Sequence, residues 1–288
     1  MDNSLLKLTD AEFPLTVIEH AKTGIGSLFE AHLHEQHLQI FYFTLGKVKM
    51  FYNQTASEFE PHDILLINTH ELHYGESLSE EVHYFVFRID LRLLSSYGIP
   101  SFGPKYLEPL ESGLVLFQNE LYSEEIKKLL ERIIEECSAR REGYELTLLS
   151  LVLNLLGQLF RKHKGKVCTR QNAEVLMKKT KRFAAVFDYI EKHYDRAVSL
   201  SEIAGHAHLS EGYFCRAFKQ ATGRTLVDYL NRFRIEKAVI LLNQGTCNVT
   251  EAALSVGFDD INYFSRVFKK YMKQSPKSYL HNDRRFLI

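Results

Sequence analysis

The chain has 288 residues, of which 45% are hydrophobic and 25% charged, and its basic and acidic side chains balance to zero net charge. This composition is typical of a folded globular protein and excludes collagen-like and disordered chains, while the length suits two domains. The longest charge-free apolar stretch, residues 146–160, is too short and too polar for a membrane span. The 4 cysteines form no CxxC pair, so we expect reduced thiols.

Charge is distributed unevenly along the chain. Residues 181–288 hold 17 basic and 11 acidic residues, a net charge of +6, whereas residues 1–180 have a net charge of −6. A basic segment joined to an acidic one is typical of a nucleic-acid-binding module attached to a domain with another function. The first residues lack a basic region followed by an apolar run, so we expect a cytoplasmic protein with no membrane partner.

The N-terminal part, residues 1–110, is predicted to be an all-β barrel or sandwich. Between residues 28 and 89, short runs rich in Phe, Tyr, Val and Ile, such as 38–45, are separated by turn residues that include Gly46 and Asn53. Short strands at this spacing, with Gly, Asn and Pro between them, indicate an antiparallel all-β domain.

Residues 111–165 are predicted to be helical. Apolar residues recur at i, i+3, i+4 and i+7 over 126–137 after a helix start at Ser123, and a second helix is predicted over 145–161. The second helix is apolar around nearly its whole circumference, so it requires burial on several sides. We expect an antiparallel helix pair, packed on the barrel or on a second subunit, that serves dimerisation and coupling. The basic stretch 166–181 is interpreted as a linker.

Residues 182–288 contain an internal repeat. The sequence YFCRAFK at 213–219 recurs as YFSRVFK at 263–269, with 5 of 7 positions identical. The surrounding pattern predicts two copies of a pair of short helices joined by a tight turn, over 199–223 and 248–273. Such a pair forms a helix-turn-helix, whose second helix can enter the major groove of DNA.

The second helix of each copy is predicted to have an apolar face toward the core and a polar face that carries an arginine, Arg216 or Arg266. Arg can read guanine, Asn can read adenine, and Lys suits phosphate. A connecting helix over 226–243 spans roughly 27 Å, close to the roughly 34 Å between successive major-groove faces. The alternative is that these faces are simply solvated, but two copies with Arg in register favour DNA reading.

Residues 183–280 resemble the DNA-binding domain of AraC/XylS-type transcription regulators, two helix-turn-helix units in one chain joined by a long helix. Motifs that carry the resemblance are SEIA at 201–204, GF at 257–258, YFSR at 263–266 and SP at 275–276. The resemblance implies base contacts from Cys215, Arg216, Asn262, Ser265 and Arg266, and phosphate contacts from Lys219 and Lys269. The chain departs from the family at Lys273, where Gly is usual, and at Gly212, which offers no side chain to a base.

A histidine motif lies in the predicted barrel. Its members fit the spacing G-x5-HxH-x4-(E/Q)-x6-G, with a further histidine after the next turn region: Gly26, His32, His34, Gln39, Gly46 and His73. An HxH pair on a strand places both imidazoles on one face, where His73 and Gln39 could complete a metal site with nitrogen and oxygen ligands. The motif resembles that of the cupin barrel, the usual sensing domain of AraC-type regulators. In metal-binding cupins the corresponding residues bind the ion.

Two interpretations of this motif stay open. Gln39 stands where Glu is usual, which weakens the charge of a metal site, so we favour a metal-free pocket and predict no cofactor. In that pocket His32, His34, Gln39 and His73 would hydrogen-bond a ligand. Strand alternation would place Phe41 and Phe43 inward together with Gln39, and such a mixture suits a small polar molecule such as a sugar.

The resemblance implies a ligand-responsive transcription regulator rather than an enzyme. Its partners would be double-stranded promoter DNA, a small effector, a second copy of the chain and, if it activates, RNA polymerase. The alternatives are a metal-dependent cupin enzyme with a helical appendage, using His32, His34 and His73 as ligands, and a non-DNA scaffold. The enzyme hypothesis predicts that removal of Arg216 and Arg266 is harmless.

Overall fold

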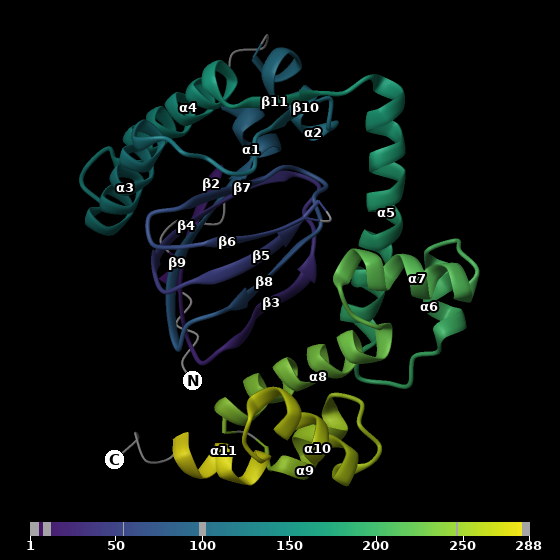
Figure 1. The fold of residues 1–288 in the computed structure, drawn as a ribbon. Coiled ribbons are helices and arrows are strands. Elements are labelled where there is room, and N and C mark those ends of the chain that lie inside the picture. Colours follow the sequence, from purple (N-terminus) through teal and green to yellow (C-terminus); the bar gives the residue numbers. More distant parts are fainter. Residues whose placement is uncertain (1–5, 8–12, 54, 98–101, 246, 284–288) are drawn as a thin grey trace. The chain divides into compact units, whose positions relative to one another are not determined.

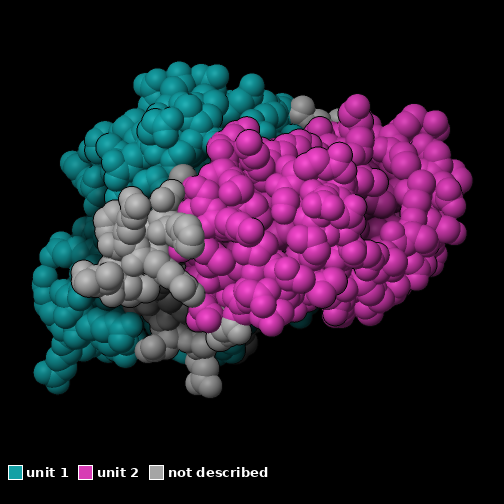
Figure 2. All heavy atoms as spheres, turned by 90° about the horizontal axis from the view of Figure 1, so that it is seen from below, with its two compact units in different colours: residues 1–180 teal, residues 181–288 magenta. Residues whose placement is uncertain are grey.

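The computed structural model describes residues 6–7, 13–53, 55–97, 102–245 and 247–283. The chain forms two compact units, residues 1–180 and 181–288, which are coloured separately in Figure 2. Two segments lie partly outside the described residues. They are residues 1–14, where we looked for a secretory leader, and the connection 97–109, which contains Gly and Pro. Among the described residues, no helix combines the length and apolar character needed to cross a bilayer.

Unit 1 contains two large antiparallel sheets, with strand orders β1-β2-β9-β4-β7 and β3-β8-β5-β6, besides the two-stranded sheet β10-β11 (Figure 1). The strands are β1 (Leu6–Lys7), β2 (Leu15–Thr23), β3 (Gly26–His32), β4 (His37–Leu45), β5 (Val48–Tyr52), β6 (Thr55–Phe59), β7 (Ile64–Ile67), β8 (His73–Ser77) and β9 (Glu81–Asp90). Apolar side chains from both sheets, among them Phe43 and Met50, form one core between them. The predicted all-β barrel is confirmed.

Strand β4 shows why this part of the sequence is so apolar. Leu38, Ile40 and Tyr42 face the attached helices, whereas Phe41 and Phe43 face the core between the sheets. A strand that is covered on both faces lacks the apolar–polar alternation of a half-exposed strand and has a nearly continuous apolar sequence. The inward direction that alternation predicts for Phe41 and Phe43 is confirmed.

The helix pair packs on the five-stranded sheet. Helix α3 (Glu124–Ala139) starts at Ser123, whose hydroxyl accepts a hydrogen bond from the Ile126 backbone N–H, and α4 (Tyr144–Lys162) follows. Buried residues of both helices share one core with Ile40 of β4. Helix α4 differs from the expectation of burial on several sides, because Leu146 and Leu153 remain 75% and 41% exposed.

The segment interpreted as a linker, residues 166–181, is instead part of two regular elements. Strand β11 (Lys164–Val167) pairs with β10 (Val115–Phe117), and helix α5 (Arg170–His193) follows after two residues. Burial of Ala173 and Thr180 continues to Phe183 along α5, which is a helical spacing. The basic composition of the segment concealed this weak periodicity. Three further short elements are α1 (Leu91–Ser96), η1 (Gly103–Leu107) and α2 (Glu108–Glu111).

Unit 2 is helical throughout its regular elements. It contains the end of α5 followed by α6 (Leu200–His206), α7 (Glu211–Thr222), α8 (Leu226–Asn243), α9 (Val249–Ser255), α10 (Ile261–Met272) and α11 (Pro276–Asp283). Helices α6–α7 and α9–α10 are the two predicted helix-turn-helix units, and α8 is the predicted connecting helix. All three predictions are confirmed.

The two helix-turn-helix units start and end in the same way. Capping boxes built by Ser199 with Glu202 and by Asn248 with Glu251 open α6 and α9. Helix α7 ends at Gly223 with φ 71°, and α10 ends at Lys273 with φ 60°. Lys273 therefore adopts the left-handed conformation that glycine provides in the first unit, at the position where the sequence departs from the family.

Candidate DNA-binding surface and effector site

Helix α7 holds its predicted DNA-binding residues on the face opposite its core residues. Phe214 and Phe218 are fully buried, whereas Cys215, Arg216 and Lys219 are exposed. The helical period produces this division, because residues three and four apart share one face. Figure 1 shows α7 after the short helix α6. The exposed face of α7 thus presents one guanidinium and one ammonium group.

Helix α10 repeats this arrangement with more polar side chains. Asn262, Arg266 and Lys269 are exposed, and Ser265 is partly exposed. The guanidinium of Arg266 lies 5.6 Å from the ring centre of Tyr263 on the same helix. A cation over an aromatic face is attracted to it, so the ring restricts the directions that the guanidinium can take.

Tyr263 contacts both Arg266 and the connecting helix, although the sequence did not mark it as part of this surface. Its hydroxyl accepts a hydrogen bond of 2.7 Å from the Asn231 amide of α8. Lys270 of α10 also reaches α8, where its ammonium donates to Asp228 at 2.6 Å. Both contacts join α10 to the connecting helix. Tyr263 recurs as Tyr213 in the repeat, and this was the available sequence signal.

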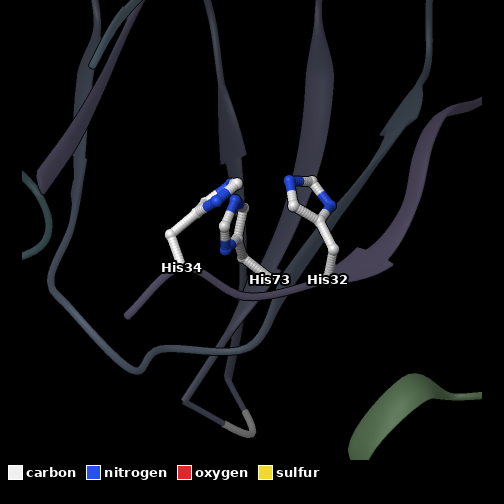
Figure 3. A group of neighbouring side chains, drawn as sticks. All are labelled: His32, His34 and His73. Atoms are coloured by element: carbon white, nitrogen blue, oxygen red, sulfur yellow. The ribbon is translucent and has the colours of Figure 1, made fainter. Parts of the chain in front are cut away.

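The barrel brings the predicted histidines together. His32 ends β3, His73 begins β8, and His34 lies in the loop after β3. One ring nitrogen from each lies within 4.8 Å of those of the other two, and Figure 3 shows the three rings as one group. Gln39 of β4 joins them, because its Oε1 lies 3.0 Å from Nε2 of His73. The predicted cluster of polar side chains therefore forms.

Burial keeps these imidazoles neutral. It lowers the pKa of His32 to about 4 and the pKa values of His34 and His73 well below the usual range, and the guanidinium of Arg88 lowers all three further. Nδ1 of His32 lies 2.8 Å from the carbonyl oxygen of Glu30, and Nδ1 of His73 lies 2.9 Å from that of Glu71. A neutral His32 that donates from Nδ1 keeps the lone pair of its Nε2 free, whereas Nε2 of His73 contacts the amide of Gln39.

The cluster meets the geometric requirement of a metal site, but a positive charge lies near it. Nδ1 donation to a backbone carbonyl, as in His32 and His73, is typical of metal-binding histidines, and with His34 the cluster offers three nitrogens to a transition-metal ion. However, the cluster contains no carboxylate, the amide of Gln39 already contacts Nε2 of His73, and the positive charge of Arg88 acts on every ring. This charge does not fit a divalent cation.

Arg88 is the site residue that the sequence analysis missed. Val82, Tyr84 and Val86 of β9 belong to the core between the sheets, so strand alternation directs Arg88 to the same interior. Arg88 also stands opposite Gln39 in the β4–β9 register. The alternation within residues 83–89 was the sequence signal, but the adjacent Phe and Ile residues, which are buried on the other face, concealed it.

A chain of hydrogen bonds joins this cluster to helix α5. The carbonyl oxygen of His34 accepts from the backbone N–H of His70 at 2.8 Å. The carbonyl oxygen of His70 in turn accepts from the hydroxyl of Thr180 at 3.1 Å. His70 has a positive φ of 64°, and Thr180 is only 5% exposed. Because α5 runs to His193, it continues past this contact into unit 2.

Comparison with known proteins assigns both units. Residues 16–156 match the family model of the AraC-like ligand binding domain, and residues 203–282 match a helix-turn-helix domain. The chain is a member of the AraC family of transcription regulators. It is 25% identical to YdeC of Bacillus subtilis (strain 168), an uncharacterized HTH-type transcriptional regulator, over 97% of each chain. It is also 40% identical to the transcriptional regulatory protein HptR of Staphylococcus aureus, over 33% of this chain and 37% of HptR.

Among solved structures, the chain is similar to ToxT of Vibrio cholerae O395, with a TM-score of 0.49 and 17% identity over 93% of this chain and 97% of ToxT. The two family matches show a DNA-binding transcription regulator with an N-terminal ligand-binding domain. The relatives are transcription regulators, and the comparisons give no support to the alternative of a metal-dependent cupin enzyme.

Proposed function

We propose that this regulator reads DNA sequence with α7 and α10 and that a small effector in the barrel controls the binding. The observation that carries the proposal is the pair of exposed arginines, Arg216 and Arg266, on two helices that repeat one sequence and one fold. Arg266, Asn262 and Ser265 would contact base edges in one major groove, and Arg216 with Cys215 in the next. Lys219 and Lys269 would contact phosphates and set the position.

The effector would bind among His32, His34, Gln39 and His73, next to Phe41 and Phe43, in the domain proposed to cover residues 1–110. Hydrogen-bonding side chains beside aromatic rings suit a small polar molecule, and a sugar belongs to that class. An effector can change DNA affinity only if it binds the two arrangements of the protein differently. The path from His34 through His70 to Thr180 connects the site to α5 and supports coupling through that helix.

A second copy of the chain is the first further partner that we propose. The helical segment 111–165 would form a homodimer, for which Leu146 and Leu153 of α4 provide an exposed apolar stripe. A dimer would place several reading helices along one operator. If the regulator activates transcription, RNA polymerase is a further partner, and the site of action would be the cytoplasm.

The test begins by selecting duplexes from a random DNA library with the wild-type protein. We expect one enriched sequence, bound with a steep salt dependence. Arg266→Ala should lose about 1–3 kcal/mol of binding free energy for that sequence and should tolerate base changes at one position. Arg182→Ala removes an exposed arginine of α5 outside the reading helices and is the matched control, which should keep discrimination. Failure to enrich any sequence, or equal discrimination by Arg266→Ala, would refute sequence reading by α10.

A further inference from the structure

The barrel interior contains a positive charge without a counter-ion. Among the described residues, no carboxylate lies within ion-pair distance of Arg88, and burial is the only influence that shifts its pKa. On the same strand, the carboxylate of Asp90 lies 3.2 Å from Nε2 of His37. Arg88 is half-buried and its Nε is fully buried, and a charge that is partly removed from water is costly unless it is paired or hydrogen-bonded. Arg88 therefore has no charged partner among the described residues.

Polar atoms at the same place in the barrel also lack hydrogen-bond partners. Nε of Arg88, Nε2 of His34 and one amide atom of Gln39 are buried and have no hydrogen-bond partner. These three residues belong to one place, because Gln39 faces Arg88 across the β4–β9 ladder and the charge of Arg88 acts on His34. A buried polar group left without a partner lowers the stability of the folded protein. Several such groups around one charge are expected where a ligand supplies the missing atoms.

The chemistry of these groups selects the class of ligand. The Nε–H of an arginine and its neighbouring terminal N–H form a planar fork that matches two oxygens of a carboxylate or a phosphate. A metal cation would be repelled by Arg88, and a neutral sugar would leave its charge uncompensated. Phe29 and Phe41, with ring centres 5.6 Å apart, border His73 and offer an apolar surface beside the charge.

We propose that the effector carries a carboxylate or a phosphate group, and that Arg88 binds this group inside the barrel with His34 and Gln39 beside it. This inference rests on the proposed function, because it assigns a ligand class to the proposed effector site. It narrows the class from small polar molecules in general to anionic ones. Arg88 would be the residue that separates an acidic ligand from its neutral analogue, since its charge is satisfied only by the former.

The experiment measures thermal unfolding of the full-length protein with acetate, inorganic phosphate, glucose or Zn²⁺, at an ionic strength held constant with sodium chloride. We expect acetate or phosphate to raise the melting temperature of the wild type by about 3 °C or more, and the more effective of the two identifies the anionic group. Arg88→Met should abolish the shift. Arg92→Met removes an exposed arginine of α1, four residues away, and should retain it.

Arg88→Met should fold, because it replaces an unpaired charge with an apolar side chain of similar length, and without anions it should melt no lower than the wild type. Arg88→Lys keeps the charge but loses the fork, so its shift with acetate should be smaller than that of the wild type. Equal shifts in wild type and Arg88→Met, or no shift with either anion, would overturn the proposal. Stabilisation by Zn²⁺ or glucose alone would overturn it in favour of a metal or a neutral ligand. DNA is absent from the assay, so its outcome is independent of sequence reading.

Discussion

At the scale of single residues, the two helix-turn-helix units end their second helices in the same backbone conformation with different amino acids. Gly223 and Lys273 end equivalent helices at φ 71° and 60°. Glycine adopts this conformation without a steric penalty, whereas a residue with a Cβ atom pays about 1 kcal/mol. Helices α10 and α11 pack in one core, to which they contribute Phe268 and Tyr279, and this packing holds Lys273 in its conformation.

This comparison predicts a stabilising substitution. Lys273→Gly should raise the free energy of unfolding of unit 2 by about 0.5–1 kcal/mol, because glycine relieves the left-handed strain. The reciprocal change, Gly223→Lys, should lower it by about 1 kcal/mol at the equivalent position. Denaturant unfolding without DNA measures both and avoids the effect of the lysine charge on binding. If Lys273→Gly destabilises unit 2, the lysine side chain itself contributes more than the strain that it imposes.

At the scale of secondary-structure elements, helix α5 is the one that runs from the effector unit into the DNA-binding unit. Its attachment within unit 1 includes the hydrogen bond from Thr180 to the carbonyl oxygen of His70. That carbonyl belongs to the residue whose N–H binds His34, so the position of α5 depends on the loop that carries the histidine cluster. An effector that moves His34 would change this attachment first.

Thr180→Val tests the attachment, since it keeps the side-chain shape and removes the hydroxyl. The buried carbonyl of His70 would then lack this donor, which costs about 1 kcal/mol. We expect amide hydrogens of α5 between residues 173 and 180 to exchange about five-fold faster, and those of β4 and β9 to be unchanged. Lys178→Ala, an exposed change on the same helix, should leave the exchange nearly as it is. Unchanged exchange in Thr180→Val would mean that α5 is held by its apolar contacts alone.

At the scale of the whole molecule, the outer face of α4 is the feature that calls for a second copy. Leu146, Leu149 and Leu153 follow i, i+3 and i+7 spacing, and the first and last are exposed. Their neighbours Leu148, Leu151 and Leu155 are buried on the barrel side. An apolar stripe at helical spacing on a solvent face is typical of a helix that pairs with a partner.

Leu153→Glu should therefore convert a dimer into a monomer, because a carboxylate in an apolar interface loses hydration without gaining a partner. Sedimentation equilibrium of the full-length protein measures the change, and we expect the dissociation constant to rise by at least tenfold. Leu254→Glu alters a leucine on α9 that is even more exposed than Leu153 and should leave the association unchanged. A wild-type protein that sediments as a monomer at all concentrations would contradict the proposed dimer.

The sequence by itself determined the architecture and the exposed helix faces that we propose to read DNA. Local periodicity is sufficient to predict helices, so α8 and the boundaries of α7 and α10 follow from apolar spacing and capping residues. The repeat of YFxRxFK marks the two helices that we propose to read DNA. The exposed residues of each helix lie on that single element, where the helical period alone determines which side chains share a face. For this reason the exposure of Arg216 and Arg266 on the polar faces of α7 and α10 was predictable without coordinates.

Only the tertiary structure decided the chemistry of the barrel and the nature of the segment at residues 166–181. The histidine cluster joins residues of β3, β4 and β8, and Arg88 enters it from β9, so its charge depends on strand pairing that is distant in sequence. Likewise, Lys164–Val167 is a strand because Val115–Phe117 pairs with it, and no local pattern predicts that partner. Local periods fix the elements, whereas charge and hydrogen bonding in a site depend on which elements meet.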